Sequence, residues 1–502
     1  MTDETDDLAG DGSGAASGET VIRRERFAGG PARSFMSSLD ADTRIFAADL
    51  AVDRAHVVML AEQGIVGDDD AAAILDALDT VEDAGHGALP EGEDVHEAIE
   101  SAVVAEVGPA GGKMHTARSR NDEVATCIRY RFREDLLDAA EASLELRAAL
   151  LDAAAEETDT VVPGFTHRKH AQPTTVGHLL ASYAGAVARD TERLLAAYER
   201  TNRSPLGSAA FAGTTFDVDR ERTAELLGFH DLIENAADAV TARDFLIEGC
   251  GAFAALSATL SGLATDLIEG AKDGHVDLDD AYASTSSIMP QKKNPDSLEL
   301  VRAVSGDAVG ELTGLLTTLK GLPRAYNRDL QRATPHAWDA VDIVTEATEV
   351  TAGAVATADW DAEACAADAG VGFSTATGVA DALAAAGVPF RTAHELVADA
   401  ASQIDNASTI EEQVAALDAA AEDVLDDSLS AYVDEATLAD LLSPAGSVAA
   451  RDSRGGPAAS AVEDSLTRLR DTHQDHAAAV DANSETLANA EKRLSTVVNE
   501  YV

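Results

Sequence analysis

Long stretches of the chain place apolar side chains three and four residues apart, which is the spacing of one buried helix face. Five of these stretches continue over several turns with few residues that break helices. They cover residues 125–157, 174–202, 236–271, 297–319 and 335–356. A small monomer cannot cover helices this long and this rich in alanine and leucine. We therefore expect a helical bundle that subunits share.

Shorter patterns before and after this block define the expected domains. Residues 1–20 are rich in Gly, Ser and Asp, and we expect them to form a disordered acidic tail. An N-terminal helical domain is expected at 21–117, a central long-helix bundle at 118–369 and a C-terminal helical domain at 370–502. The predicted fold class is therefore all-α, with three helical domains.

The composition predicts a folded but very acidic protein. The 502 residues contain 90 acids against 37 bases, which gives a formal net charge of −53. A hydrophobic content of 45% with helical periodicity argues against disorder beyond the N-terminus. The negative charge repels nucleic acid and anionic membranes, so we expect neither as a partner. It suits a surface adapted to high salt, because the Debye length at molar ionic strength is roughly 3 Å.

The cysteines and the uncharged segments favour a cytoplasmic protein. Cys127, Cys250 and Cys365 lie far apart without metal-ligand spacing, so we expect buried free thiols in a reducing compartment. The acidic opening MTDETDDLAG lacks the features of a secretory signal. The uncharged runs at 171–188 and 249–265 are broken by Gly, Ser and Thr, and are expected to be buried bundle helices that do not span a membrane.

The segment 285–299, TSSIMPQKKNPDSLE, concentrates polar chemistry between two helical patterns. Two of the chain's seven lysines, Lys292 and Lys293, are adjacent here. Asn294 is a favourable N-cap and Pro295 suits the first helical position, so we expect a helix to begin at this point. Ammonium groups, an amide and the free N–H groups of a helix start together indicate an anion site. An ordinary capped loop is the alternative.

Three further breaks between the long patterns carry polar side chains. Residues 113–122, KMHTARSRND, place arginines, a serine and an asparagine near a helix start, which suits a carboxylate or phosphate; solvated arginines in a capping segment are the alternative. Residues 163–173 contain His167 and His170, either of which is a candidate general acid or a structural residue. No neighbouring residue completes a metal-ligand set, so no metal is predicted. Residues 321–331 offer polar groups to a ligand, although a helix–helix turn would also explain them.

Two other polar clusters are expected to be structural. Residues 129–133, RYRFR, alternate arginine with aromatic residues, as some RNA-binding segments do. In so acidic a chain, a solvated or subunit-facing stripe is the preferred interpretation. His473 and His476 are expected at the surface.

Taken together, in the order in which they follow one another along the chain, the polar segments resemble those of the fumarase/aspartase superfamily. Within it they resemble the argininosuccinate lyase family. The superfamily signature Gly-Ser-Ser-x-Met-Pro-x-Lys-x-Asn-Pro is matched by residues 285–295, and Met-Pro-Gln-Lys-Lys-Asn-Pro-Asp is the form of that family. Residues 115–122 resemble its His-Thr-Gly-Arg-Ser-Arg-Asn-Asp. The resemblance extends from about Arg26 onward, with further matches at 163–173, 204–207, 319–327 and 387–391.

The resemblance implies a homotetramer in which three chains assemble each active site. The implied reaction is the reversible anti elimination of argininosuccinate to arginine and fumarate, the last step of arginine biosynthesis, without a metal or organic cofactor. Ser286 is implied as the general base, His167 as the acid for the departing nitrogen, and Glu299 as the residue that orients this acid. The implied substrate-binding residues are Ser38, Asp42, Ser119, Arg120, Asn121, Thr166, Arg243, Asn294, Tyr326 and Gln331.

These residue types suit an elimination. Removing a proton beside a carboxylate builds a doubly charged aci-carboxylate, so cationic and amide donors must already be in place. Lys292, Asn294 and the loop amides are expected to supply them. The same positive loop can stabilise the alkoxide form of Ser286 once closure excludes water.

The chain departs from the family pattern at several positions. Ala117 and Thr285 replace glycines that are usual there, and residues 241–242 read Thr-Ala where Ser-Asp is usual. After Gln331 the common Glu-Asp-Lys becomes Arg-Ala-Thr at 332–334, so a cation often found there is missing. Arg332 is the candidate to compensate.

Two other functions remain as alternatives. One is a sibling lyase that acts on adenylosuccinate, malate or aspartate, which the Gln-Lys-Lys triplet at 291–293 and the Ser-Arg-Asn run at 119–121 argue against. The other is a catalytically inert structural relative of the kind used as lens protein. The filled base, acid and loop positions argue against that one.

Overall fold

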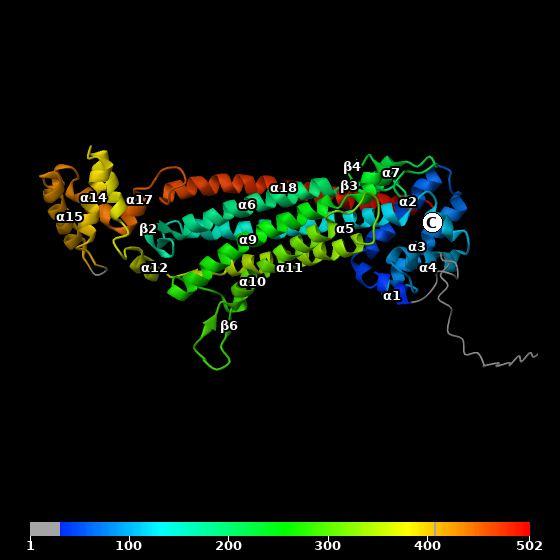
Figure 1. Ribbon diagram of the computed structural model, residues 1–502, viewed down its shortest axis with the longest axis horizontal. Helices are drawn as coiled ribbons and strands as arrows, with labels where there is room; N and C mark the ends of the chain where they lie inside the picture. The colour runs from blue at the N-terminus through cyan, green and yellow to red at the C-terminus, as the bar shows by residue number, and fades with distance from the viewer. Residues whose placement is uncertain (1–30, 406–407) are drawn as a thin grey trace, which may run out of the picture.

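The computed structural model describes residues 31–405 and 408–502, so the acidic tail predicted at 1–20 lies outside the described residues. The molecule is elongated, with a long helical bundle between two smaller helical clusters (Figure 1). The all-α prediction is confirmed, because the described strands are short and form only two-stranded sheets.

The central bundle contains the long helices that the sequence predicts. They are α5 (Arg120–Glu156), α6 (Val176–Thr201), α9 (Asp244–Asp273), α10 (Asp296–Leu319) and α11 (Leu330–Ala356). The single pattern expected at 236–271 is divided, because Ala242 and Arg243 leave the helical path and separate α8 (Ala236–Thr241) from α9.

Phe132 lies at the centre of the bundle core. Its side chain on α5 is fully buried, and its ring contacts Phe245 and Phe253 of α9 and Trp338 of α11. Gly249 of α9 makes room for this ring, since a Cβ atom there would lie 2.4 Å from Phe132 Cζ. Three helices therefore meet at one aromatic cluster, and their spacing depends on a residue without a side chain.

The predicted C-terminal domain at 370–502 does not form one packed unit. Its last helix, α18 (Ala459–Val498), runs back along the bundle and packs against α5 and α6 (Figure 1). Val462, Leu466 and Val480 of this helix belong to the bundle core. The sequence pattern did not reveal this long helix because α18 buries only a few residues among many polar ones. We therefore propose that α18 belongs to the central unit.

The two smaller units have apolar cores of their own. The N-terminal core includes Leu50, Ile74 and Ile99, and the C-terminal core includes Leu383 and Leu396. The N-terminal unit consists of α1 (Pro31–Met36), α2 (Phe46–Glu62), α3 (Asp68–Ala84) and α4 (Val95–Val107) with the 3-10 helices η2 (Ala41–Ile45), η3 (His86–Ala88) and η4 (Gly111–His115). The C-terminal unit consists of α13 (Ala376–Ala385), α14 (Phe390–Ala401), α15 (Ile410–Leu425), η6 (Leu429–Ala431), α16 (Glu435–Leu442) and α17 (Pro444–Ala449). The preceding helix α12 (Ala362–Ala369) packs against β1, and its Cys365 belongs to the bundle core.

Short strands occupy the connections between bundle helices. The antiparallel hairpin of β1 (Val161–Thr166) and β2 (Lys169–Thr175) joins α5 to α6. A second hairpin, β6 (Ser284–Thr285) with β7 (Lys293–Asn294), precedes α10 and projects away from the bundle (Figure 1). The remaining elements are β3 (Arg203–Ser204), α7 (Arg220–Leu227), β4 (Asp231–Leu232), β5 (Val276–Asp277), η5 (Asp280–Tyr282) and β8 (Asp359–Trp360).

Among the described helices, only α9 is long and apolar enough to cross a membrane by length and composition. Half of its most apolar window is buried, and the helix packs against α6, α10 and α11. A core helix of a bundle meets the same criteria. We therefore interpret α9 as a bundle helix.

Arg129 and Arg133 do not belong to a solvated or subunit-facing stripe of the kind that we expected. Arg129 and Arg133 are buried, and Arg129 donates to the carbonyls of Arg200 and Thr201 at the end of α6. Its guanidinium carbon also lies 3.9 Å from the ring centroid of Phe245. A helix C-terminus carries unpaired carbonyls and partial negative charge, which satisfies a buried cation. These arginines therefore stabilise the α5–α6 contact.

The histidines of α18 are not fully exposed either. His473 and His476 are half-buried, and Arg147 of α5 donates to His476 Nδ1 at 3.2 Å. The surface position expected for both histidines is therefore wrong, because α18 turns this face toward α5.

The Gly249–Phe132 contact predicts how two glycine substitutions differ. Gly249→Ala should lower the free energy of unfolding by about 1–3 kcal/mol, because the added methyl overpacks the aromatic cluster. Gly185→Ala on α6 is the matched control, since its Cβ would lie 3.8 Å from Leu469 Cδ2. That change should be neutral or stabilising by about 0.5–1 kcal/mol. Urea denaturation in molar KCl, followed by circular dichroism, measures both. Equal effects of the two changes would contradict this account of the core.

Candidate active site

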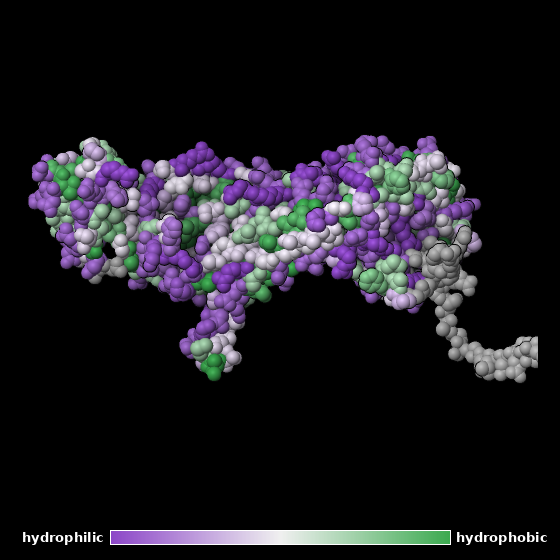
Figure 2. Space-filling model, in the orientation of Figure 1, coloured by the Kyte–Doolittle hydropathy of each residue, from purple (hydrophilic) through white to green (hydrophobic). Residues whose placement is uncertain are grey.

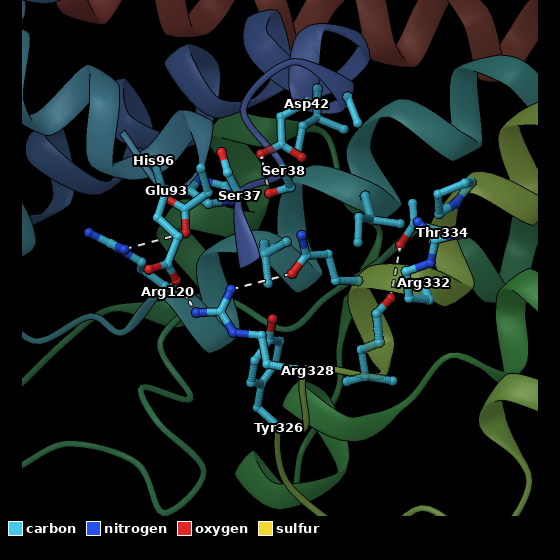
Figure 3. Close-up of a pocket in the computed structure, with 18 of the residues that line it drawn as sticks. Ser37, Ser38, Asp42, Glu93, His96, Arg120, Tyr326, Arg328, Arg332 and Thr334 are labelled. Carbon is cyan, nitrogen blue, oxygen red and sulfur yellow. Dashed lines mark hydrogen bonds and ion pairs between the residues drawn. The ribbon is translucent and has the colours of Figure 1, made fainter. Parts of the chain in front are cut away.

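A cavity of about 550 Å³ opens where the N-terminal unit meets the bundle (Figure 3). Its lining includes η2, the start of α4, the start of α5, the break before α9, and the segment from Tyr326 into α11. Seven of the predicted substrate-binding residues line it: Ser38, Asp42, Arg120, Asn121, Arg243, Tyr326 and Gln331. The fold therefore gathers side chains that lie almost 300 residues apart in the sequence.

Asp42 provides a half-buried carboxylate in this cavity. Ser38 Oγ donates to Asp42 Oδ2 at 2.7 Å, and the Val95 backbone N–H donates to the same oxygen at 3.2 Å. Burial raises the pKa of Asp42, and the positive charge of His96 partly opposes that rise. Asp42 is therefore positioned to accept from a cationic group of a ligand.

The start of α5 places Arg120 and Asn121 in the cavity. Ser119 is the N-cap of this helix, and it forms a capping box with Asp122. Ser119 itself does not line the cavity, because its side chain is used for the cap. Arg120 Nη1 lies 3.3 Å from Asp94 Oδ2, and Asn121 Nδ2 donates to the Ala210 carbonyl at 3.0 Å. The capped first turn thus holds both polar side chains at one edge of the cavity.

The opposite segment of the cavity is fixed by the loop before α11. Thr241 Oγ1 accepts from the Ala325 N–H at 2.8 Å, and Gln331 Nε2 donates to the Met36 carbonyl at 3.0 Å. Thr241, a departure from the family pattern, therefore still supplies the hydroxyl that anchors the residue next to Tyr326.

A buried ion network lies beside the cavity and joins α2, α4 and α5. The Arg118 side chain is 1% exposed, and its guanidinium contacts Asp53 at 2.5 Å and Glu123 at 2.9 Å. His96 Nδ1 lies 2.8 Å from Asp49 Oδ2, and the His96 residue also lines the cavity. The sequence prediction missed this network, although the polar residues 93–100 around a helix start were a signal for it.

The same network contains the described groups with metal-ligand geometry. One is Asp49, His96 and Cys127, and the other is Asp49, Asp53 and Glu123. In both groups the chain's own cations already contact the carboxylates, as the Arg118 and His96 distances show. We therefore assign these side chains to the ion network and not to a metal.

Four further predicted residues lie on or beside the projecting hairpin, away from the cavity (Figure 1). Ser286 is in the loop between β6 and β7, where its Oγ accepts from the Met289 N–H at 3.1 Å. Lys292 follows in the same loop and donates to the Asn294 side chain. Glu299 is exposed in the first turn of α10. The loop is open, and its Ile288 side chain is 83% exposed.

Asn294 is not the N-cap that the sequence predicted. It pairs with Ser284 in the hairpin, and α10 begins at Asp296 after Pro295, without a side-chain cap. The pairing of β6 with β7 holds Asn294 in extended backbone. Its amide is therefore oriented by the hairpin and not by the helix start.

Thr166 and His167 lie at the turn of the β1–β2 hairpin, which Figure 1 places toward the end of the bundle away from the cavity. His167 and Arg168 have positive φ values of 53° and 60°. This backbone conformation is unusual for residues other than glycine and is often found at functional turns. One chain therefore separates the predicted site into three groups.

The two replaced glycines behave differently. Ala117 has a φ of 62°, in the left-handed region that glycine prefers, so this loop keeps its path at a cost of about 1 kcal/mol. Thr285 lies in β6, paired with Lys293, where a side chain fits extended backbone. Neither substitution removes the expected loop.

Comparisons with known proteins show the family to which the chain belongs. A family model described as Lyase matches residues 33–310, and one described as Argininosuccinate lyase C-terminal matches residues 373–449. Argininosuccinate lyase of Natronomonas pharaonis is 64% identical over 487 residues, which cover 97% of this chain and 98% of that protein. The chain belongs to the argininosuccinate lyase family.

Other members of the family support the assignment. Argininosuccinate lyase of Halobacterium salinarum strain R1 is 65% identical over 454 residues, covering 90% of this chain and 93% of that protein. Both of these similar proteins come from halophilic archaea, as the acidic composition suggests. The argininosuccinate lyase of Methanothrix thermoacetophila is 44% identical over 477 residues, with 94% and 96% covered.

Solved structures show the same fold. The crystal structure of EDDS lyase in complex with formate has a TM-score of 0.85 and 33% identity, covering 94% of this chain and 96% of that one. Recombinant class II fumarase from Schistosoma mansoni has a TM-score of 0.68 at 15% identity, covering 80% of this chain and 90% of that one. The second likeness concerns the fold alone.

The buried His56 and His96 predict opposite pH dependences of stability. Burial alone would lower the pKa of His96, but Asp49 and Glu123 raise it to about 10. Its bound proton stabilises the fold below the usual pKa of 6.5, and this contribution is lost as the pH rises toward 10. Burial and Arg118 lower the pKa of His56 to about 3, so stability falls as the pH drops from 6.5 toward 3.

Two variants separate these contributions. His96→Gln should flatten the alkaline decline of the free energy of unfolding, and His56→Gln should flatten the acid decline. Urea unfolding at several pH values measures both slopes, with exposed His230→Gln as the control. An unchanged alkaline slope in His96→Gln would show that His96 is not held as an imidazolium.

Proposed function

We propose that this chain is a carbon–nitrogen lyase that converts argininosuccinate reversibly to L-arginine and fumarate, the last step of arginine biosynthesis. One observation carries the proposal: seven of the ten substrate-binding residues that the family resemblance implies line one cavity. The signature loop is displayed on a projecting hairpin. The high identity to argininosuccinate lyases favours this substrate over those of sibling lyases.

The cavity suits the polar groups of argininosuccinate. Argininosuccinate carries three carboxylates and one ammonium besides the guanidino group. Arg120, Arg243 and the Asn121 amide line the cavity as donors for carboxylates, and Asp42 is an acceptor for the ammonium. Burial lowers the pKa of Arg243 to about 10, which still leaves its guanidinium charged at neutral pH.

The hairpin loop supplies the base. The Ser286 alkoxide removes a proton from the succinyl carbon, and the electron pair forms the double bond of fumarate. The bond from the neighbouring carbon to the guanidino nitrogen breaks, and that nitrogen takes a proton from His167, which Glu299 orients. Before the carbon–nitrogen bond breaks, negative charge builds on the carboxylate beside the deprotonated carbon. Lys292 and the Asn294 amide stabilise this charge.

These steps require residues that one chain holds apart, so we infer a homotetramer in which three chains form each site. Exposed apolar side chains on α10 support this assembly. Leu300, Val309 and Leu316 are 63%, 51% and 46% exposed, in a chain with a net charge of −53. Figure 2 shows pale and green side chains along this part of the bundle. Apolar surface of this kind marks an interface.

The setting of the reaction is also a proposal. We place it in the cytoplasm at high salt, because Cys127, Cys250 and Cys365 are all buried free thiols and the surface is strongly acidic. The small-molecule substrate needs neither nucleic acid nor membrane as a partner.

A substrate panel tests the reaction. Purified protein in molar KCl is offered argininosuccinate, adenylosuccinate, malate and aspartate in turn, and fumarate is followed by ultraviolet absorbance. We expect fumarate from argininosuccinate alone. Activity only on another substrate would identify a sibling lyase. No fumarate from any of the four substrates would favour an inert structural protein.

A second experiment tests the base and the assembly. Ser286→Ala should lower kcat by at least about a hundredfold, because general base catalysis is lost, while the oligomer keeps its size in gel filtration. Tyr326→Phe should also lower activity, because Tyr326 lines the cavity in which the substrate binds. Refolding the two variants together should recover activity, since a mixed tetramer contains sites with both residues intact. Near-normal rates in Ser286→Ala would refute the assignment of the base, and no recovery would refute shared sites.

A further inference from the structure

Tyr282 fixes the first end of the projecting β6–β7 hairpin to the bundle. It is the last residue of η5, two positions before β6, and its side chain packs against the bundle core. On α11 its ring meets Gly353, where a Cβ atom would lie 2.7 Å from Tyr282 Cε1 and closer still to the hydroxyl oxygen. Gly353 therefore forms a notch in α11 that a residue with a side chain could not provide.

Hydrogen bonds join the two ends of the hairpin beside this notch. Ser297 Oγ, in the first turn of α10, donates to the Tyr282 carbonyl at 2.5 Å. Ser284 Oγ donates to the side chain of Asp296, the first residue of α10. The β6–β7 ladder itself contains only two residue pairs, and so short a hairpin is not stable without support. Its position therefore depends on the residues where it leaves the bundle.

The ion pairs near this end of the hairpin are too exposed to hold it. Lys293 Nζ lies 3.1 Å from Asp277 Oδ2 and 3.0 Å from Asp280 Oδ1, but these two acidic side chains are 73% and 96% exposed. Exposed pairs contribute little to stability, and molar salt screens them further. Packing of the Tyr282 ring is not screened by salt. The ring is therefore the stronger of the two attachments.

The attachment lies close to the proposed base. Ser286 follows Tyr282 by four positions, and its backbone N–H donates to the Lys292 carbonyl at 3.0 Å where the loop opens. A shift of Tyr282 is therefore passed along β6 to Ser286. A displacement of about 1 Å in a reacting group can lower a rate by about a hundredfold.

We propose that Tyr282, seated against Gly353, is a positioning residue that sets where the Ser286 hydroxyl is presented. The inference rests on the proposed function and deepens it, because it names residues outside the loop and outside the cavity that control proton removal. Neither Tyr282 nor Gly353 lines the cavity. Their effect is therefore on the rate of the chemical step and not on the binding of argininosuccinate.

Steady-state kinetics in molar KCl test this effect on the intact protein. Tyr282→Ala should lower kcat by at least about tenfold while the KM for argininosuccinate changes by less than about threefold. Gly353→Ala should lower kcat similarly, because its methyl group pushes the ring out of the notch. Tyr282→Phe should keep a near-normal kcat, since no described residue hydrogen-bonds the hydroxyl. Asp280→Asn, which removes an exposed partner of Lys293, is the control and should leave kcat unchanged.

Two double variants show whether these residues act through one another. Once the ring is gone, a methyl group at position 353 has nothing to displace. Tyr282→Ala with Gly353→Ala should therefore lose no more activity than Tyr282→Ala alone. Tyr282→Ala should also lower kcat little further in Ser286→Ala, because the base that it positions is already absent. Circular dichroism and gel filtration check that fold and oligomer are kept.

Hydrogen exchange tests the attachment without turnover. Peptides that cover residues 283–295 should exchange faster in Tyr282→Ala and in Gly353→Ala than in wild type or Asp280→Asn. Exchange in the middle of α5 should stay unchanged, because the bundle itself is kept. Mass spectrometry of the intact oligomer after timed exchange in molar KCl measures both segments.

The outcomes are distinct. A near-normal kcat in Tyr282→Ala, losses that multiply when Gly353→Ala is added, a full further loss in the Ser286→Ala background, or unchanged exchange at 283–295 would each overturn the inference. A wild type that forms no fumarate from argininosuccinate, while exchange at 283–295 responds to both substitutions, would overturn the proposed function alone.

Discussion

The cavity depends on the buried ion network of Arg118, Asp53, Glu123, His96 and Asp49. Charges removed from water are costly unless each meets a partner at short range, so the carboxylates of α2 must face the cations held by α4 and the start of α5. The observed placement of these helices brings Arg118 to Asp53 and Glu123 and brings His96 to Asp49. Because η2, which bears Asp42, leads directly into α2, and Arg120 follows Arg118 by two residues, the same placement sets the cavity lining.

The length of the bundle imposes the second constraint. Its helices hold the β1–β2 hairpin, the β6–β7 hairpin and the cavity at separate places along the molecule (Figure 1). A single chain therefore has most of the proposed binding residues in one place, and the proposed base and acid in two others. The exposed apolar side chains of α10 offer a route to bring copies together, and in molar salt the strong negative charge of each copy is screened at short range.

Substitutions in the family's loops are absorbed by local geometry. Ala117 adopts the left-handed backbone that a glycine would take, and Thr241 keeps the hydroxyl that anchors Ala325. At 332–334 the change is different. The lysine usual at position 334 is replaced by Thr334, and Arg332 provides a cation about half a helical turn earlier on α11, in the lining of the same cavity. The position of charge in the cavity is thus retained while the residue that provides it differs.

Local pattern determined the long bundle helices, the capped start of α5 and the identity of the signature loop, because helical periodicity, N-capping and turn residues act between neighbours in the chain. The family resemblance of those loops also named seven of the residues that line the cavity. Tertiary structure alone decided that Asn294 pairs in a hairpin, that Arg129 and Arg133 are buried against α6, and that α18 returns along the bundle. It also decided the ion network, in which Asp53 and Arg118 are 65 positions apart. The burial of a charge depends on partners that folding brings from elsewhere, and no local spacing records which partners those are.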